Sequence, residues 1–168
     1  TFILLVFGTV AIFCLEFTNA KTLQPLSYQG KILASCFQAV TPRTAGCNTL
    51  NIGDMTVASQ FLIVILMFIG ASPGSTGGGI KTTTFAAIML GVLSIIKGEE
   101  DTKIYARRLP RDQILKGATL VFIAFLLVIS VTMILSITEE ADFLSIIFET
   151  TSAFGTVGLT MGLTPQLT

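Results

Sequence analysis

Two short glycine-bearing turns are the part of this sequence whose residue types and spacing most clearly suggest chemistry. Thr44–Gly46 is Thr-Ala-Gly, and Thr156–Gly158, at an offset of 112 residues, is Thr-Val-Gly. Each turn closely follows a short apolar segment, Lys31–Val40 or Phe143–Phe154. Glycine permits backbone dihedrals with which successive carbonyl oxygens face one axis, and the C-terminal end of a helix favours a cation. The pattern therefore predicts that backbone oxygens coordinate a dehydrated monovalent cation.

The residue types argue against several other kinds of chemistry. Histidine, the commonest general base and neutral metal ligand, is absent. Carboxylates do not cluster at the spacing of a Ca²⁺ or Mg²⁺ site. We therefore expect no metal beyond the conducted cation, no organic cofactor on this chain and no covalent reaction, so that the protein is not an enzyme. The formal net charge is zero, which leaves no strongly basic face for nucleic acid.

A glycine-rich segment interrupts the longest apolar stretch. Thr56–Ile96 has 41 residues and as one helix would be about 62 Å long, twice the hydrocarbon core of a bilayer. Six of the ten residues in Gly70–Gly79 are glycine or proline, so the helix must break there. Non-helical backbone at membrane depth is tolerated only where protein buries it or where it lines a water-filled cavity. The break predicts part of a transport path, and the intramembrane Lys81 is a candidate gate residue.

The same segment nearly matches a phosphate-binding P-loop. Gly74 and Gly79 have the spacing of that motif, but Ile80 separates the second glycine from Lys81. No predicted strand precedes the segment, and no strand ending in aspartate follows it to hold Mg²⁺. A nucleotide-binding membrane enzyme that uses Gly74–Thr82 therefore remains only as an alternative interpretation.

The composition predicts that the elements positioning these residues lie in a membrane. Hydrophobic residues are 52% of the 168 residues and charged residues 12%, about half the charged share of a soluble domain. Mean hydropathy is +0.82. Phe2–Leu15 and Thr119–Ile137 are predicted spans, the first of them incomplete, and we expect the chain to be a fragment of a longer one. Lys97–Lys116 holds six of the ten lysines and arginines, which predicts a cytoplasmic loop.

The predicted elements occur in a repeating order. A span, a short helix, a glycine turn and a broken span come first, and after the basic loop a span, a short helix and a glycine turn follow again. Phe37 corresponds to Phe148 at an offset of 111, one less than the offset of the two turns. The sequence therefore predicts repeated units with one residue of slippage between helix and turn.

Three segments carry a resemblance to a known family: TPRTAGCNT at residues 41–49, GSTGGGIKTT at 74–83 and SAFGTVGLT at 152–160. Together they resemble the Trk/Ktr/HKT superfamily of potassium transporters, and most of all its Ktr-type bacterial membrane subunit, which translocates the ion. TVGLT at 156–160 also resembles the TVGYG filter of potassium channels. The resemblance covers essentially the whole chain. It implies an all-α membrane protein of repeated transmembrane helix–pore-loop–transmembrane helix units, similar to potassium-channel pore modules.

The resemblance also implies a division of the chain within a four-repeat protein. Residues 1–96 would be the third pore unit, with outer helix, pore helix, filter and a broken inner helix whose intramembrane loop is 70–83. Residues 97–116 would be the cytoplasmic loop. Residues 117–168 would begin the fourth unit, whose closing helix is absent. Two further pore units would lie in the remainder of the same polypeptide.

Site residues follow from the resemblance position by position. One quarter of the selectivity filter would be Thr44, Ala45, Gly46 and Cys47, and another would be Thr156, Val157, Gly158 and Leu159. The gate would be Gly74, Ser75, Thr76, Gly77, Gly78, Gly79 and Lys81. The family usually has phenylalanine where Cys47 stands, which leaves the filter glycine intact but alters the packing behind it. We expect Arg43, beside the first turn, to bind helix-end carbonyls rather than ions.

The function that the resemblance implies is K⁺ uptake across the plasma membrane by a multi-pass protein in contact with lipid. The Gly-rich loop would gate the path under the control of a cytosolic nucleotide-binding regulatory subunit, the membrane subunit would form a homodimer, and Na⁺ is a candidate second ion. The alternative from the residues alone is a secondary transporter of another fold, with broken helices and a midplane substrate site. That alternative would not require the two turns.

Overall fold

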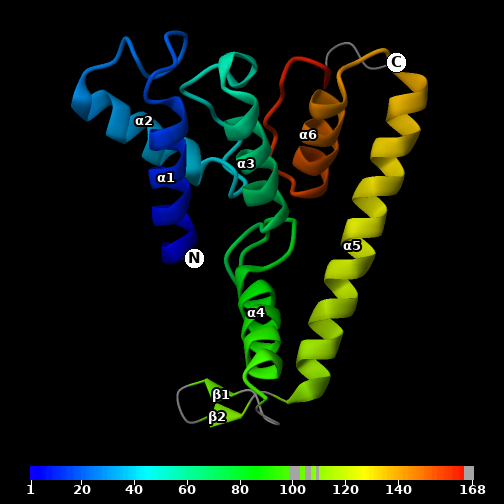
Figure 1. Cartoon of the computed structure of the whole chain (residues 1–168). Helices are drawn as coiled ribbons and strands as arrows, with labels where there is room; N and C mark the ends of the chain where they lie inside the picture. The colour runs from blue at the N-terminus through cyan, green and yellow to red at the C-terminus, as the bar shows by residue number, and fades with distance from the viewer. Residues whose placement is uncertain (99–102, 105–106, 109, 165–168) are drawn as a thin grey trace.

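A computed structural model describes residues 1–98, 103–104, 107–108 and 110–164. Within these residues helices supply every long element. Figure 1 shows α1, α2, α3 and α6 grouped at one end, α4 beyond them and α5 running along the whole height. The elements in chain order are α1 (Phe2–Glu16), α2 (Tyr28–Val40), the 3₁₀ turn η1 (Ile52–Asp54), α3 (Val57–Phe68), α4 (Thr82–Ile96), β1 (Lys103–Ile104), β2 (Arg107–Arg108), α5 (Arg111–Thr138) and α6 (Phe143–Phe154).

The helices follow the predicted segments, with two earlier starts. Helix α6 has the predicted bounds. Helix α2 begins at Tyr28 because the Ser27 hydroxyl caps it, accepting a hydrogen bond from the Gly30 amide at 3.2 Å. Helix α5 begins at Arg111 rather than Thr119. Proline costs no hydrogen bond at a helix start, and the charged residues after it are good helix formers that a search for apolar runs overlooks.

The predicted cytoplasmic loop contains a short antiparallel ladder beside the otherwise helical fold. Strand β1 pairs with β2, with Lys103 opposite Arg108. Strands of two residues are too short to produce the alternating pattern from which a strand is recognised. Residues 99–102, 105–106 and 109 of the predicted loop lie outside the described residues.

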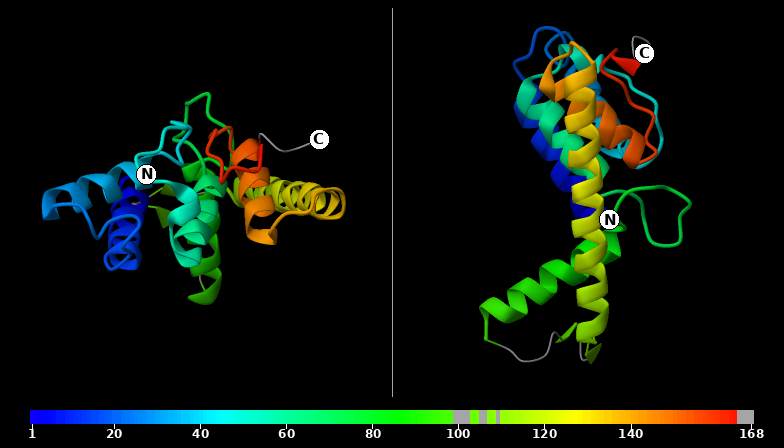
Figure 2. Two further views of the ribbon diagram at one scale, coloured as in Figure 1. Left: turned by 90° about the horizontal axis from the view of Figure 1, so that it is seen from above. Right: turned by 90° about the vertical axis from the view of Figure 1, so that its right-hand side faces the viewer.

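The predicted break in the long apolar stretch is confirmed. Helix α3 has 12 residues and α4 has 15, or about 18 and 22 Å, so each is shorter than the roughly 30 Å hydrocarbon core. Helix α4 follows α3 toward the opposite end of the molecule and packs beside α5, with residues 69–81 between α3 and α4 projecting to one side (Figures 1 and 2). In the described part of the chain, α5 alone has the length and apolar composition to cross a membrane unaided.

Helix α5 presents small residues to the protein and large apolar residues outward. Its buried residues are Gly117, Ala124, Val128 and Thr132, which share one face. Large side chains such as Phe122 and Ile134 are about three-fifths exposed. Exposed apolar surface on this scale would be unfavourable in water, and it is the composition of a lipid-facing helix.

The core lies at the end of the molecule where five helices meet. Helix α1 packs against α2 and α3, and α6 packs between α3 and α5, which Figure 2 shows from above. Side chains from all of these helices except α5, together with residues from η1, its C-cap and the predicted second turn, form one buried cluster: Ile12, Ala39, Ile52, Met55, Ile63, Val64, Met67, Phe148, Val157 and Leu159. The turn is therefore fixed by the same packing that holds the helices together.

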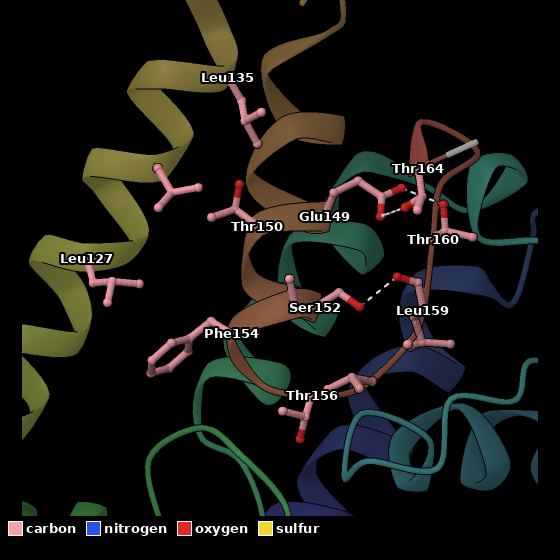
Figure 3. A pocket seen from close by; sticks show the side chains of 14 residues that line it. Leu127, Leu135, Glu149, Thr150, Ser152, Phe154, Thr156, Leu159, Thr160 and Thr164 are labelled. Atoms are coloured by element: carbon pink, nitrogen blue, oxygen red, sulfur yellow. Dashed lines mark hydrogen bonds between the residues drawn. The ribbon is translucent and has the colours of Figure 1, made fainter. Parts of the chain in front are cut away.

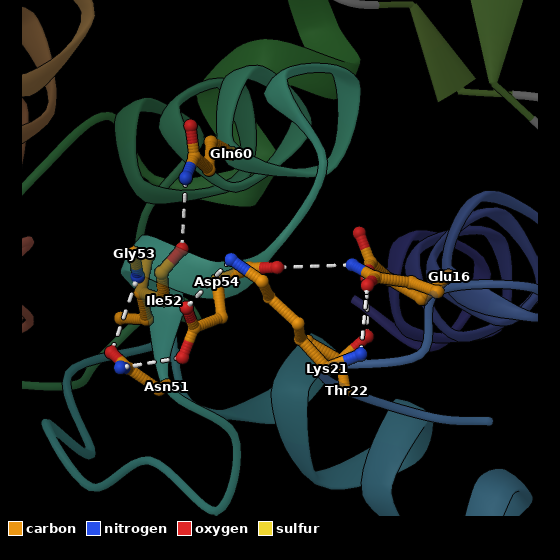
Figure 4. Close-up of polar contacts among 9 residues, drawn as sticks. Glu16, Lys21, Thr22, Asn51, Ile52, Gly53, Asp54 and Gln60 are labelled. Atoms are coloured by element: carbon orange, nitrogen blue, oxygen red, sulfur yellow. Dashed lines mark hydrogen bonds and ion pairs between the residues drawn. The ribbon is translucent and has the colours of Figure 1, made fainter. Parts of the chain in front are cut away.

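A buried carboxylate joins the end of α1 to the start of α3, and Figure 4 shows it beside Thr22. Glu16 is fully buried, and one of its carboxylate oxygens accepts hydrogen bonds from the side-chain amide of Asn19 at 2.7 Å and from the Thr22 hydroxyl at 2.5 Å. Its second oxygen accepts from both the backbone N–H and the hydroxyl of Thr56, each at 2.8 Å. Because a buried carboxylate is tolerated only when its oxygens are satisfied, this set of donors fixes the position of α3 relative to α1.

Glu16→Gln is expected to destabilise the full-length protein by about 2–4 kcal/mol. The amide retains one accepting oxygen but turns an N–H₂ group toward donors, and hydrogen bonds to a charged group contribute about 1.5–3 kcal/mol each. Thermal unfolding of the detergent-solubilised protein measures the effect. Glu140→Gln, at an exposed position, is the matched control. Equal loss of stability in both variants would contradict the structural role of Glu16.

Candidate functional site

The two predicted turns share an uncommon backbone conformation. Thr44 has φ +69° and Gly46 has φ +70°, while Thr156 has φ +52° and Gly158 has φ +84°. In the described part of the chain, the two threonines are the only non-glycine residues with positive φ. A β-branched residue in this region is strained, and such strain concentrates at functional sites. Because φ alternates in sign, successive N–H groups share one face of the backbone and the carbonyl oxygens share the other.

Matching hydrogen bonds hold each turn to its helix. The amide of Ala45 donates to the Thr41 carbonyl at 3.2 Å, and the amide of Val157 donates to the Ser152 carbonyl at 2.9 Å. The hydroxyls of these two residues also donate, Thr41 to the Cys47 carbonyl and Ser152 to the Leu159 carbonyl. Helix partners are 111 residues apart and turn partners 112, which is the slippage predicted from the sequence.

The tertiary structure brings the two turns against each other. A Cβ atom at Gly46 would lie 2.6 Å from the Val157 carbonyl oxygen and 3.8 Å from the Gly158 Cα. The approach is closer than real Cβ atoms make, so only glycine fits at residue 46 without movement of the neighbouring turn. Residues far apart in the chain thus place their backbone carbonyls in one small region.

Side chains behind the second turn are packed, and those behind the first are less so. Val157 and Leu159 are each 3% exposed and belong to the core cluster, whereas Thr156 and Gly158 face away from it. Cys47 corresponds to Leu159 but is exposed. The first turn therefore lacks the buried side chain that anchors its counterpart.

Part of the glycine-rich loop lies directly against both turns. A Cβ atom at Gly77 would be 2.8 Å from Thr44 Cγ2, and one at Gly78 would be 2.9 Å from Thr156 Cγ2. The Gly78 amide donates to the Thr156 hydroxyl at 2.8 Å. Figure 2 shows the loop on the same side of the molecule as α6. Gly77 and Gly78 are thus the predicted gate residues that the fold brings to the turns, whereas Gly79 lies against Gly70 and Met67.

The other predicted gate residues lie farther out. Gly74, Ser75 and Thr76 are exposed, and no atom lies within 4 Å of the position that a Cβ would take at Gly74. Lys81 folds back into the loop and donates to the carbonyls of Ser75 at 2.9 Å and Gly77 at 2.6 Å. The lysine therefore closes the loop on itself.

Arg43 acts as predicted. Its Nη1 donates to the Gly70 carbonyl at 3.2 Å, immediately after the end of α3, which ties the first turn to the start of the loop.

The geometry does not favour the P-loop interpretation. A P-loop follows a strand, but α3 precedes residues 70–81. The Lys81 ammonium, which would have to reach a phosphate, is held by two carbonyl groups of its own loop.

Comparison with known proteins identifies the family. The family model described as TrkH, cation transport protein, matches residues 1–168, the whole of the chain. The chain belongs to the TrkH cation transport protein family. It is therefore a membrane protein. Because the match covers every residue, the alternative of an unrelated transporter fold is set aside.

Relatives of this TrkH-family chain include named potassium transporters. It is 46% identical over 172 residues to the Ktr system potassium uptake protein B of Bacillus subtilis (strain 168), covering all of the chain and 38% of that relative. It is 40% identical to the Ktr system potassium uptake protein D of the same organism, covering 98% of the chain and 36% of the relative. It is 38% identical to the potassium/sodium uptake protein NtpJ of Enterococcus hirae, covering 98% of the chain and 38% of that relative. The TrkH-family chain thus spans less than two-fifths of the length of each of these relatives.

A buried acid of this TrkH-family chain, Glu149, lies behind the second turn and was not predicted from the sequence. Glu149 is 7% exposed and accepts hydrogen bonds from the Thr160 hydroxyl at 2.5 Å, the Met161 amide at 3.0 Å and the Thr164 hydroxyl at 2.6 Å. It lines a cavity of about 720 Å³ between α5, α6 and the second turn (Figure 3). A charged residue in an otherwise apolar short helix was the signal in the sequence. Its carboxylate holds the chain that leaves the turn against α6.

Proposed function

We propose that this chain forms part of the ion path of a K⁺ uptake protein, with Thr44–Gly46 and Thr156–Gly158 as two quarters of a backbone-carbonyl selectivity filter. The observation that carries the proposal is the pair of turns with alternating φ that lie against each other. The names of the relatives support K⁺ as the ion, and one of those names also includes sodium. A ring of carbonyl oxygens replaces the hydration shell of a monovalent cation.

The proposed outer ends of the filter are Cys47 and Leu159. Their carbonyls accept hydrogen bonds from hydroxyls of the preceding helices, so they hold the turns while the carbonyls before them bind the ion. The helices α2 and α6 direct their C-terminal ends, which carry partial negative charge, toward the turns. This arrangement favours a cation over an anion without any acidic side chain in the path.

The proposed gate is the glycine-rich loop, and in this conformation it is closed. Gly77 and Gly78 lie against the threonines of the two turns, and Lys81 stabilises the loop by binding two of its carbonyls. Opening the path would require the loop to leave Thr44 and Thr156. Since Lys81 binds two carbonyls of the loop, the loop would move as one unit and would not unfold.

The surroundings of the path are proposed from the family. The protein would be a multi-pass plasma-membrane protein, in which the remainder of the polypeptide supplies two further pore units around the same axis. It would act as a homodimer, with a cytosolic nucleotide-binding subunit controlling the loop from the side of the basic segment 97–116. Na⁺ dependence is the further proposed property.

Uptake by cells that lack their own K⁺ transporters tests this function. The full-length protein is expected to restore growth at limiting K⁺ and to take up Rb⁺ in a way that excess K⁺ inhibits more strongly than excess Na⁺. Carbonyl oxygens at fixed separation favour the ions that match that spacing. Cells carrying the empty vector are the control. Rb⁺ uptake that K⁺ does not inhibit would contradict the assignment.

A further inference from the structure

Two buried hydroxyl groups occupy equivalent positions behind the two turns. Thr41 is 1% exposed and Ser152 is 3% exposed. Thr41 Oγ1 donates to the Cys47 carbonyl, and Ser152 Oγ donates to the Leu159 carbonyl at 2.6 Å (Figure 3). Each accepting carbonyl belongs to the residue that follows the turn glycine. The same functional group, a side-chain hydroxyl, therefore makes the same contact behind both turns.

The same two residues also hold the entry to each turn. The carbonyl of Thr41 accepts from the Ala45 amide, and the carbonyl of Ser152 accepts from the Val157 amide. Each residue thus binds its turn on both sides of the glycine. The backbone is held at the N–H of the residue before the glycine and at the C=O of the residue after it, which restricts the rotation of the glycine carbonyl between them. A flexible glycine at positive φ would otherwise permit such a rotation.

We propose that Thr41 and Ser152 are positioning residues that fix the direction of the Gly46 and Gly158 carbonyls, and so help determine which cation the turns prefer. The inference rests on the proposed filter function. Each hydroxyl turns one carbonyl back toward its own helix, which leaves the preceding glycine carbonyl directed to the face shared by the turn. Selectivity between ions of similar charge depends on the separation and number of such oxygens.

The two turns differ in how much else supports them. Leu159 is buried in the core, and Glu149 holds the residues beyond it. Cys47, which corresponds to Leu159 in the first turn, is exposed and does not anchor that turn in the core. The hydroxyl of Thr41 therefore carries a larger share of the positioning than that of Ser152, so the same change is expected to have a larger effect at residue 41.

Flux measurements on the full-length protein in liposomes test the proposal. Thr41→Val keeps the shape of the side chain but removes the donor, and it is expected to lower the ratio of K⁺ to Na⁺ flux about fivefold to tenfold. Ser152→Ala is expected to lower the ratio by a smaller factor. Thr41→Ser and Ser152→Thr keep a hydroxyl donor and are expected to retain the original flux ratio. If the ratio depended on side-chain packing rather than on the donor, these two variants would change it as well.

The matched control is Ser130→Ala. Ser130 Oγ donates to the Leu126 carbonyl at 2.7 Å on α5, so the change removes a hydroxyl-to-carbonyl bond of the same kind away from the turns. Its flux ratio is expected to stay unchanged. The binding of K⁺ to detergent-solubilised protein, measured as a shift of the thermal midpoint, serves if a variant conducts too little to measure.

The outcomes separate this proposal from the function on which it rests. If Gly46→Ser lowers the flux ratio but Thr41→Val and Ser152→Ala do not, the positioning role is overturned and the filter stands. The positioning role is also overturned if Thr41→Val and Ser152→Ala reduce the K⁺ and Na⁺ fluxes in equal proportion, because an equal reduction reports damage to the structure and not a change of selectivity. If the ratio changes in none of the variants, including Gly46→Ser, the proposed filter itself is wrong.

Discussion

Gly46→Ser is expected to lower the selectivity of the full-length protein for K⁺ over Na⁺ by at least about tenfold, and more than Gly158→Ser does. Both glycines have positive φ, where a side chain adds about 1–3 kcal/mol of strain, and about 1.4 kcal/mol corresponds to a tenfold change. At residue 46 the new Cβ would also lie 2.6 Å from the Val157 carbonyl oxygen, whereas at residue 158 its nearest neighbour is 3.8 Å away. The first variant therefore disturbs both turns.

Gly98→Ser is the control for the strain alone. Gly98 has φ +72°, close to that of Gly46, but no atom lies within 4 Å of the position that its Cβ would take, and it follows α4 at the opposite end of the molecule. Its selectivity is expected to match that of the unmodified protein. An unchanged flux ratio in both Gly46→Ser and Gly158→Ser would remove the two turns from the ion path.

Deletion of Gly77–Gly79 is expected to raise K⁺ flux at least about fivefold in liposomes. The deletion removes the segment that lies against the two turns, including the amide of Gly78 that binds the Thr156 hydroxyl. A closed state that loses 1–2 kcal/mol of stabilisation changes its population ratio by a factor of about 5–30. Lys81→Met, which only releases the loop carbonyls, is expected to raise the flux by a smaller factor.

A point variant makes the same test with less change to the chain. Gly78→Ala places a Cβ 2.9 Å from both the Phe154 carbonyl oxygen and Thr156 Cγ2, so the loop cannot keep its closed position. Gly74→Asn is the control, because asparagine tolerates positive φ and the space around Gly74 is open. Lower or unchanged flux in well-folded Gly78→Ala and deletion variants would show that the loop is not a barrier.

Helices and their interruption were largely predictable, because each depends on local composition. Phe143–Phe154 has the predicted bounds, and the break at 69–81 follows from glycine and proline within a segment too long for one span. The start of α5 was predicted too late because charged helix formers do not contribute to an apolar run. The pairing of β1 with β2 was missed because two residues per strand leave no pattern.

The site was predictable only as a set of positions. The Thr-Ala-Gly and Thr-Val-Gly turns and their offset of 112 are visible in the sequence, and so are the glycines of the loop. The positive φ of the two threonines was not visible in the sequence, since among these residues only glycine indicates that conformation in advance. The acids Glu16 and Glu149 were likewise missed, because a buried carboxylate is recognised by donors that come from distant parts of the chain.

The sequence by itself determined that this chain is apolar and broken in the middle, since these properties depend on residue type and spacing. Only the tertiary structure decided that Gly46 meets Val157, that Gly77 and Gly78 lie against the turn threonines, and that the hydroxyls of the helices hold the carbonyls after the glycines. These contacts join residues up to 111 positions apart. Which of them form depends on how α3 and α6 pack, and no local pattern records that packing.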